Sequence, residues 1–170
     1  KEQQARCVFE YIYFARLDSK IDGMSVYDSR MLAGKYLAMD SPVDADLVVG
    51  VPESGNAAAM GYALQSGIPY GVAFVKNSYV GRTFIKPKQS SRESSVQVKL
   101  NVLREAVAGK RIIMIDDSIV RGTTSDRIVT MLREAGAKEV HMMVSSPPFL
   151  WPCYSGTDVP VREQLIAYNR

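Results

Sequence analysis

The sequence predicts an α/β fold in which a central, mostly parallel sheet is flanked by helices. Short Val- and Ile-rich runs alternate with helix-forming stretches, and isolated Gly and Pro residues separate them. With 170 residues, 46% of them hydrophobic, the chain is long enough for one well-packed core and too short for two ordinary domains. Parallel sheets of this kind have right-handed crossovers and bind ligands at the carboxyl ends of their strands.

The first seventy residues predict two strands, each followed by a turn or loop and a helix. The hydrophobic stretch CVFEYIYFA from Cys7 predicts a strand, and the turn-rich LDSKIDG separates it from MSVYDSRMLAGKYL, whose apolar residues recur at helical spacing. Asp46 to Val51, DLVVGV, predicts a second strand that stops at Pro52. After the loop PESGN, the AAAMGYAL stretch is strongly helix-forming.

The rest of the chain continues the alternation of strands and helices, which one polar segment interrupts. Further strands are predicted at Tyr70 to Val75, Arg111 to Ile115 and Val140 to Ser145. Further helices are predicted at Val96 to Val107, at Thr124 to Ala135 and near Val161 to Ala167. The segment from Lys76 to about Ser95 lacks periodicity, which is typical of a functional lid or a disordered loop. The excess of Lys and Arg from Lys76 to Arg104 suits a small polyanion, although a solvated basic loop explains the charge equally well.

Composition argues against several functional classes. The net charge is only +3 and the basic residues are mostly scattered, unlike those of a dedicated nucleic-acid-binding protein. The longest apolar runs are strand-sized, so no membrane span is expected, and no secretory leader is visible. The expected location is the cytoplasm, although a chain that begins at Lys1 leaves open that a signal was removed or a larger protein trimmed.

Cysteine and histidine provide no obvious metal site or catalytic centre. Cys7 and Cys153 are far apart in the sequence and show no metal-binding spacing, which predicts two buried, reduced thiols. His141 is the only histidine and lies in the apparent strand VHMMVSS. We expect it to be a packed strand residue and not a catalytic base.

The segment RIIMIDDSIVRGTTS, Arg111 to Ser125, predicts a site for a phosphorylated ribose. Gly122 permits a tight turn whose N–H groups can surround an anion at a helix start, and Thr123 to Ser125 add hydroxyl donors and a cap. Asp116 and Asp117 suit hydrogen bonds from sugar hydroxyls, or Mg²⁺. The sequence has no GxxxxGK[ST] and no GxGxxG after this strand. An acidic turn with an ordinary helix cap would explain DDS alone, but not the whole segment.

This segment resembles the phosphoribosyl pyrophosphate motif of type I phosphoribosyltransferases. Together with CVFEYIYFAR, VPESG and KNSYVGRTFIKP, it resembles the amidophosphoribosyltransferase family, glutamine-dependent enzymes that open purine synthesis. The resemblance extends from about Cys7 to Tyr168, and the four blocks occur in the order found in that family. It implies the type I phosphoribosyltransferase fold with a long flexible lid loop.

The resemblance also implies roles for individual residues. The 5-phosphate would bind at Ser118 to Ser125, and Asp116 and Asp117 would bind the ribose hydroxyls. Mg²⁺ would be shared by Asp116, Asp117, Ser54 and the pyrophosphate, although Ser54 alone is also explained as a helix N-cap. The implied substrate-binding residues are Glu53, Ser54, Gly55, Asp116, Asp117, Ser118, Arg121, Gly122, Thr123, Thr124 and Ser125.

In the family, the polar segment corresponds to a lid that closes over bound substrate. Lys76, Tyr79 and Arg82 match its catalytic residues, and the cations of Lys76 and Arg82 can pair with pyrophosphate oxygens. This chain has Ser78 where the family often has Arg, which weakens the local charge, and Leu17 where FARPDS is usual, which alters a turn.

The implied reaction is the displacement of pyrophosphate from C1 of ribose by ammonia, which forms 5-phosphoribosylamine without an essential histidine or general base. Residues 1–170 would form the phosphoribosyltransferase domain, with an N-terminal glutaminase domain and the C-terminal end of the protein lying outside this chain. The glutaminase domain of the same parent chain would supply the ammonia, and the family suggests a homo-oligomer. Cys7 and Cys153 match two of the four ligands of the iron–sulfur cluster that some members hold, and the other two would lie beyond Arg170.

Two rival interpretations remain. A salvage phosphoribosyltransferase would join the same sugar to a nucleobase, and Phe149, Trp151 and Tyr154 could form its base-binding hood. A non-enzymatic sensor of phosphoribosyl pyrophosphate would need a nucleic-acid surface, but no helix-turn-helix or dense basic face is recognisable.

Overall fold

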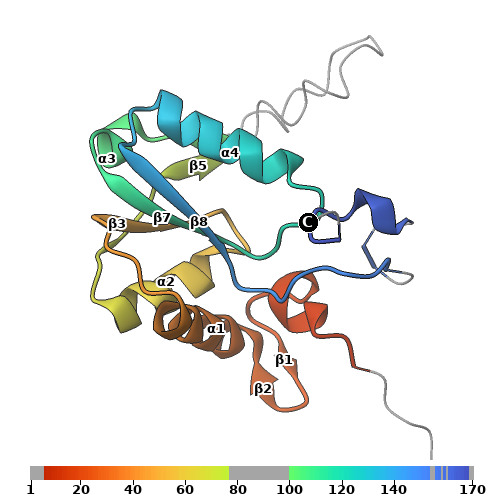
Figure 1. The fold of residues 1–170 in the computed structure, drawn as a ribbon. Coiled ribbons are helices and arrows are strands. Elements are labelled where there is room, and N and C mark those ends of the chain that lie inside the picture. The colour runs from red at the N-terminus through yellow and green to blue at the C-terminus, as the bar shows by residue number, and fades with distance from the viewer. Residues whose placement is uncertain (1–5, 77–99, 154–155, 158, 160, 169–170) are drawn as a thin grey trace, which may run out of the picture.

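The computed structural model describes residues 6–76, 100–153, 156–157, 159 and 161–168. Its centre is a four-stranded parallel sheet in the order β4 (Tyr70–Gly71), β3 (Leu47–Gly50), β7 (Arg111–Asp116) and β8 (Glu139–Val144) (Figure 1). The predicted parallel sheet is therefore confirmed. Because the neighbouring strands are parallel, the carboxyl ends of β3 and β7 lie side by side at one edge.

Both faces of the sheet are covered, and alternate residues of β3 and β7 enter two different cores. Leu47 and Met114 pack on the side of α4 (Thr123–Glu134). Val48 and Ile113 pack on the opposite side, with α2 (Asn56–Ser66). A strand buried on both faces needs apolar residues at every position, which explains the unbroken runs LVV and IIMI.

On the second face, α1 (Val26–Asp40) packs closely on α2 (Figure 1). Ser25 begins α1, because its side chain accepts a hydrogen bond from the Asp28 N–H at 3.2 Å. Gly34 lies so close to Ala58 that a Cβ atom at position 34 would collide with the Ala58 carbonyl. The two helices thus touch backbone to backbone, which only a residue without a side chain allows.

Smaller elements surround this sandwich. They are the π-helix η1 (Glu10–Phe14), the hairpin β1 (Lys20–Ile21) and β2 (Met24–Ser25), the antiparallel pair β5 (Phe74–Lys76) and β6 (Leu100–Val102), the short helix α3 (Arg104–Val107) and the 3-10 turn η2 (Arg162–Gln164). No helix in the described ranges is long and apolar enough to cross a membrane.

Three predictions of secondary structure are wrong. The stretch from Cys7 to Ala15 contains η1 and no strand, and its Tyr11 and Ala15 carbonyls accept hydrogen bonds from Arg30 of α1 instead of from a sheet. A helix was predicted at Val96–Val107. The residues of this range that the structure describes form β6 followed by α3, because Leu100–Val102 pairs with β5. Tyr70–Val75 is divided between two sheets, since β4 pairs with β3 and β5 pairs with β6.

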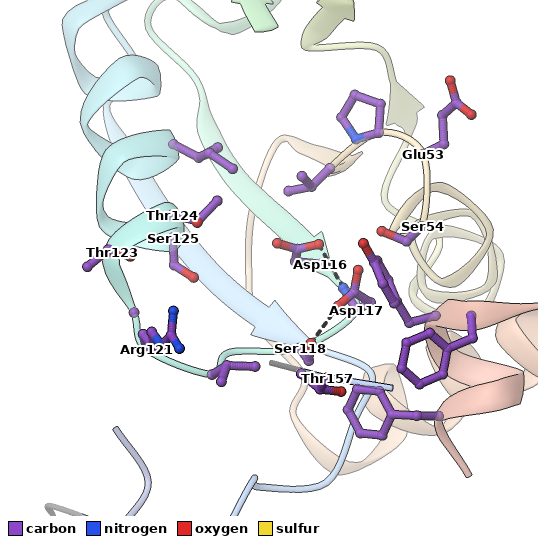
Figure 2. A pocket seen from close by; sticks show the side chains of 18 of the residues that line it. Glu53, Ser54, Asp116, Asp117, Ser118, Arg121, Thr123, Thr124, Ser125 and Thr157 are labelled. Atoms are coloured by element: carbon purple, nitrogen blue, oxygen red, sulfur yellow. Dashed lines mark hydrogen bonds between the residues drawn. The ribbon is translucent and has the colours of Figure 1, made fainter. Parts of the chain in front are cut away.

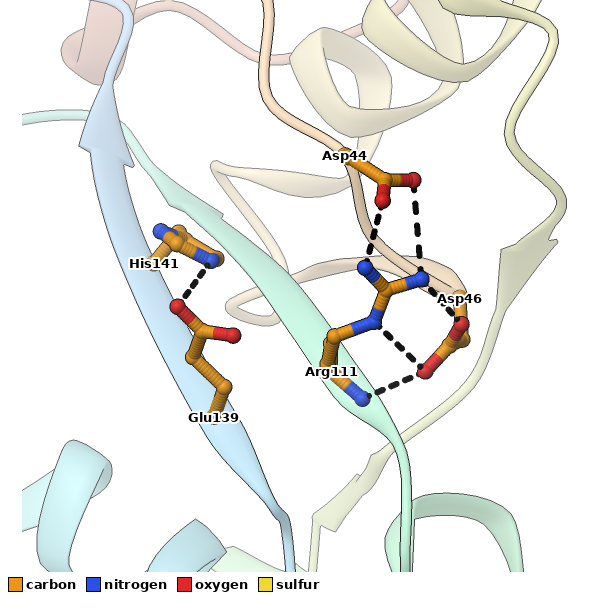
Figure 3. Close-up of polar contacts among 5 residues, drawn as sticks. All are labelled: Asp44, Asp46, Arg111, Glu139 and His141. Carbon is orange, nitrogen blue, oxygen red and sulfur yellow. Dashed lines mark hydrogen bonds and ion pairs between the residues drawn. The ribbon is translucent and has the colours of Figure 1, made fainter.

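At the end of the sheet opposite the carboxyl ends, an ion-pair cluster joins β7 to the chain entering β3 (Figure 3). Arg111 contacts Asp44 at 2.6 Å and Asp46 at 2.7 Å, and its backbone N–H donates to Asp46 at 2.8 Å. These bonds lower the pKa of Asp46 to about 2 and raise that of Arg111. The cluster therefore sets the register in which β7 enters the sheet.

The structure also places the single histidine and the two cysteines of the sequence. His141 lies on β8 with its Nε2 3.0 Å from a Glu139 carboxylate oxygen, although the two are poorly aligned for a hydrogen bond (Figure 3). Cys153 is partly buried but Cys7 is exposed, so the prediction of two buried thiols is wrong for Cys7. Neither cysteine is in a disulfide.

Candidate functional site

A pocket of about 1030 Å³ opens at the carboxyl ends of β3 and β7 (Figure 2). The loop after β3 forms one wall, the segment from β7 to α4 forms another, and η1 with residues 156, 157 and 159 closes the remainder. This is the edge at which a parallel sheet is expected to bind ligands.

Two adjacent carboxylates lie at the centre of the pocket. Asp116 ends β7, and both it and Asp117 are more than 90% buried. The Asp117 N–H donates to Asp116 Oδ1 at 2.8 Å, and the Ser118 hydroxyl donates to Asp117 Oδ1 at 2.6 Å. Burial, followed by the charge of Asp117, raises the pKa of Asp116 to about 7. Two buried acidic groups side by side favour a cation or hydroxyl donors as their ligand.

The guanidinium of Arg30 is buried and interacts electrostatically with Asp117. Arg30 of α1 is 6% exposed and donates to the carbonyls of Tyr11 at 2.7 Å and Ala15 at 3.0 Å. Burial lowers the pKa of Arg30, and the carboxylate of Asp117 opposes that shift. Arg30 therefore connects η1, which forms part of the pocket wall, to the acidic centre.

The segment from Ser118 to Ser125 leads from the carboxylates into α4; it is here called the phosphate loop, after the ligand that the sequence predicts for it. Gly122 has φ of 81°, a left-handed conformation that favours glycine, and it is the N-cap of α4. The first N–H groups of a helix have no intrahelical acceptor and carry partial positive charge. Thr123 begins α4, so the predicted side-chain cap by Thr123 to Ser125 is wrong; these residues form the first turn and line the pocket instead.

Opposite the phosphate loop, the pocket is lined by the loop that follows β3. Glu53 and Ser54 line the cavity, and the peptide between Pro52 and Glu53 is cis. The Lys76 ammonium, at the end of β5, pairs with the Glu53 carboxylate at 2.9 Å. Ser54 is not the cap of α2, because that helix begins at Asn56 with Gly55 as its N-cap.

Nearly all the described residues that sequence analysis selected come together in this one pocket. Those that line it are Glu53, Ser54, Lys76, Asp116, Asp117, Ser118, Arg121, Gly122, Thr123, Thr124 and Ser125. Gly55 is buried and packs behind the wall, against Ile115. Tyr79 and Arg82 lie outside the described residues.

Sequence analysis did not select the aromatic wall. Tyr13 and Phe14 of η1 and the preceding Phe9 line the pocket, and the Phe9 ring packs edge-on against Phe149 at 4.8 Å between ring centroids. Thr157 and other residues near the C-terminus line it too. The block CVFEYIYFAR contributed to the family resemblance. Because it was predicted to be a strand, however, nothing in the sequence indicated that its aromatic side chains line a ligand-binding pocket.

The donor set fits Mg²⁺ better than a metal held by protein ligands alone. Asp116, Asp117 and Ser54 offer oxygen atoms around one cavity. In the described part of the chain, no cluster of three or more His, Cys, Asp or Glu side chains is placed to hold a metal ion. Mg²⁺ commonly binds through one or two carboxylates together with substrate phosphates, which matches this set. These 170 residues alone cannot supply the four cysteine ligands of an iron–sulfur cluster, because they contain two cysteines.

Residues 29–146 match the phosphoribosyl transferase domain family, and the chain therefore belongs to that family. The central parallel sheet with helices on both faces is accordingly a type I phosphoribosyltransferase fold.

Among phosphoribosyltransferases, the chain is similar over nearly its whole length to amidophosphoribosyltransferases. It is 61% identical over 166 residues to that of Archaeoglobus fulgidus, a match covering 98% of this chain and 36% of that protein. The Synechocystis protein is 60% identical over 161 residues, covering 95% and 32%. The chain thus spans about a third of the length of these relatives.

Two solved structures have the same fold. One is that of the allosteric regulatory enzyme of purine biosynthesis, with 57% identity and a TM-score of 0.84 over 96% of this chain and 35% of that one. The other is the glutamine phosphoribosylpyrophosphate amidotransferase of B. subtilis in complex with ADP and GMP, with 57% identity and a TM-score of 0.83 over 96% and 36%.

Proposed function

We propose that the pocket binds phosphoribosyl pyrophosphate and that the chain is the phosphoribosyl-transfer part of an amidophosphoribosyltransferase. The observation that carries the proposal is the position of the carboxylate pair. Asp116 and Asp117 lie between the start of α4 on one side and the loop containing Ser54 on the other (Figure 2). An acidic centre between two anion-binding elements suits a ribose that carries a phosphate at one end and a pyrophosphate at the other.

Each end of the substrate has a chemical counterpart. The 5-phosphate would accept hydrogen bonds from the first turn of α4 and from the hydroxyls of Thr123, Thr124 and Ser125. The ribose hydroxyls would donate to Asp116 and Asp117. The pyrophosphate would accept hydrogen bonds from the Ser54 hydroxyl and from backbone N–H groups of the loop that contains Glu53, Ser54 and Gly55. Lys76 would exchange its pairing with the Glu53 carboxylate for a pyrophosphate oxygen. These fixed contacts at both ends would hold C1 in position for attack.

The reaction would form a bond between the ammonia nitrogen and C1 as the C1–oxygen bond breaks and pyrophosphate leaves with its electron pair, and the new C1–nitrogen group would then lose one proton to water. Lys76, together with Tyr79 and Arg82, would stabilise the charge that develops on the leaving group. Mg²⁺, held by Asp116, Asp117 and Ser54, would supply further positive charge at the pyrophosphate when bound. Because the leaving group is already activated, no side chain needs to form a covalent intermediate.

The relatives support a proposal about the rest of the protein. Since their length is about three times that of this chain, we propose a parent protein in which a glutaminase domain produces the ammonia from glutamine. A further segment of such a parent would be needed to complete any cluster that includes Cys7 and Cys153. The proposed enzyme would act in purine synthesis, as a homo-oligomer.

An assay of pyrophosphate release tests this function. The protein is incubated with phosphoribosyl pyrophosphate, Mg²⁺ and ammonia, and separately with nucleobases in place of ammonia. We expect pyrophosphate release that depends on ammonia and a rate at least about tenfold lower in Asp117→Asn, because a charge-assisted contact is lost. Release that requires a nucleobase would instead show a salvage phosphoribosyltransferase and would overturn the proposal.

A further inference from the structure

The C-terminal segment, residues 161–168, lies against the outer side of the phosphate loop. The Arg121 guanidinium donates to the Gln164 side-chain oxygen at 2.6 Å, and the Ile166 N–H donates to the Val120 carbonyl at 3.0 Å. A Cβ atom at Gly122 would lie 2.8 Å from Ile166 Cδ1, so the isoleucine side chain covers the turn directly. Three consecutive loop residues are therefore contacted from one side by this segment.

The C-terminal segment also has contacts outside the phosphate loop. Leu165 is fully buried. The Arg162 guanidinium donates to the Leu150 carbonyl at 3.0 Å and stacks on the rings of Trp151 and Tyr168, at 3.8 Å and 4.2 Å from their centroids. Because Arg162 ties the segment to Leu150 and Trp151, which lie outside the phosphate loop, the segment can restrain that loop instead of merely following it.

The phosphate loop benefits from such a restraint. Gly122 has a left-handed backbone, and glycine loses more conformational freedom on folding than any other residue. An anion site made of backbone N–H groups requires the loop to hold one conformation before the ligand arrives, because ordering during binding reduces affinity. Contacts at Val120, Arg121 and Gly122 act where the loop turns into α4.

We propose that the C-terminal segment is a brace that holds the phosphate loop in its anion-binding conformation, with Gln164 and Ile166 as positioning residues for the 5-phosphate. The inference rests on the proposed function. It concerns one end of the substrate only, because the loop after β3 is supported elsewhere, by Ile115 and by the pairing of Lys76 with Glu53. Loss of the brace therefore weakens ribose 5-phosphate binding and spares pyrophosphate binding.

Calorimetric titration with ribose 5-phosphate and, separately, with Mg²⁺ and inorganic pyrophosphate distinguishes this role from general stability. The variants are Gln164→Ala, Ile166→Ala and both together. Val161→Ala is the matched control, since Val161 is 44% exposed and belongs to the same segment. We expect the double variant to raise the Kd for ribose 5-phosphate about tenfold, equivalent to a charge-assisted hydrogen bond, with an unchanged Kd for pyrophosphate.

Gln164→Glu, which keeps an acceptor oxygen for Arg121, is expected to bind ribose 5-phosphate as the wild type does. An unchanged Kd for ribose 5-phosphate in the double variant would overturn the brace and leave the proposed function intact. Equal losses for both ligands, or a similar loss in Val161→Ala, would overturn it too, because they would indicate a general loss of structure. A wild type that binds neither ligand would overturn the proposed function itself, and the brace with it.

Discussion

Gly55 lies directly against Ile115: a Cβ atom at position 55 would collide with the Ile115 carbonyl oxygen. That oxygen also accepts a hydrogen bond from the Val51 N–H at 2.9 Å. Ile115 immediately precedes Asp116, so the loop proposed to hold pyrophosphate is fixed to the strand that presents the proposed ribose-binding carboxylates. The two halves of the site are thus positioned by one backbone contact.

Gly55→Ala is expected to disturb both stability and ligand binding. The new methyl group would meet backbone atoms that cannot rotate away, and such overpacking costs about 1–3 kcal/mol. Urea unfolding measures that loss, and calorimetry is expected to show weaker pyrophosphate binding. Gly109→Ala is the control, because Gly109 has φ of 75° but open space around it, so only backbone strain is added. Unchanged pyrophosphate binding in Gly55→Ala would contradict this account.

Lys76→Met is expected to weaken pyrophosphate binding about tenfold, because one charge-assisted contact contributes about 1.5–3 kcal/mol. The difference from the wild type should shrink at high salt, since the Lys76 side chain is half exposed and its charge is screened. Lys110→Met is the matched control: the Lys110 ammonium donates to the Ala106 carbonyl at 2.7 Å and does not line the pocket. If Lys76→Met and Lys110→Met bind pyrophosphate with equal affinity, Lys76 does not contribute to the pyrophosphate site.

The cluster around Arg111 predicts a specific pH dependence of stability. Arg111 lowers the pKa of Asp46 to about 2, below the value of about 4 expected in the unfolded chain. The folded state therefore binds fewer protons, and the stabilisation is present above pH 4 and lost as the pH falls from about 4 to 2.

The urea midpoints of the wild type and of Asp46→Asn, followed from pH 6 to pH 2, measure this contribution. The wild type is expected to be more stable than Asp46→Asn at pH 6. The difference between their urea midpoints should become smaller as the pH falls from about 4 to 2. Asp28→Asn serves as a comparison, because Asp28 is exposed and its side chain is not in this cluster. A difference between wild type and Asp46→Asn that stays constant across the titration would show that the ion pair contributes nothing.

Arg30→Met is expected to destabilise the protein by about 3 kcal/mol, because the carbonyls of Tyr11 and Ala15 lose a buried, charged donor. The near-ultraviolet circular dichroism of the aromatic residues in η1 should weaken at the same time. Lys35→Met, an exposed site on the same helix, controls for loss of a positive charge. If both variants unfold at the same urea concentration, the role assigned to Arg30 is wrong.

The parts of the fold that could be predicted from sequence are those with a strong local pattern. The run RIIMI is apolar at every position because the strand is covered on both faces, and the following helix has regular apolar spacing and a glycine at its start. The carboxylates and the hydroxyl-rich loop lie between these two elements. Their convergence in one pocket with Ser54 followed from the parallel order of the strands.

The parts that could not be predicted depend on contacts distant in sequence. Aromatic residues such as Tyr11 and Phe14 favour strands by propensity, but bonds from Arg30 hold their backbone in a π-helix. Leu100 forms a strand because Lys76 lies opposite it, and no local periodicity reveals that partner. The contact of Ile166 with Gly122 likewise cannot be predicted from the sequence, because the two residues are far apart in the chain.

Calorimetric titration of the protein with phosphoribosyl pyrophosphate and Mg²⁺ tests the central claim most directly, with Asp116→Asn/Asp117→Asn as the variant. The double substitution keeps the shape of the pocket, removes the carboxylates proposed to hold the metal, and replaces one of the two acceptor oxygens of each side chain by an NH₂ donor that cannot accept from a ribose hydroxyl. We predict saturable binding at one site per chain in the wild type and a Kd raised by at least about a hundredfold in the variant. Equal affinity in the two proteins, or no saturable binding by the wild type, would contradict the assignment of this pocket.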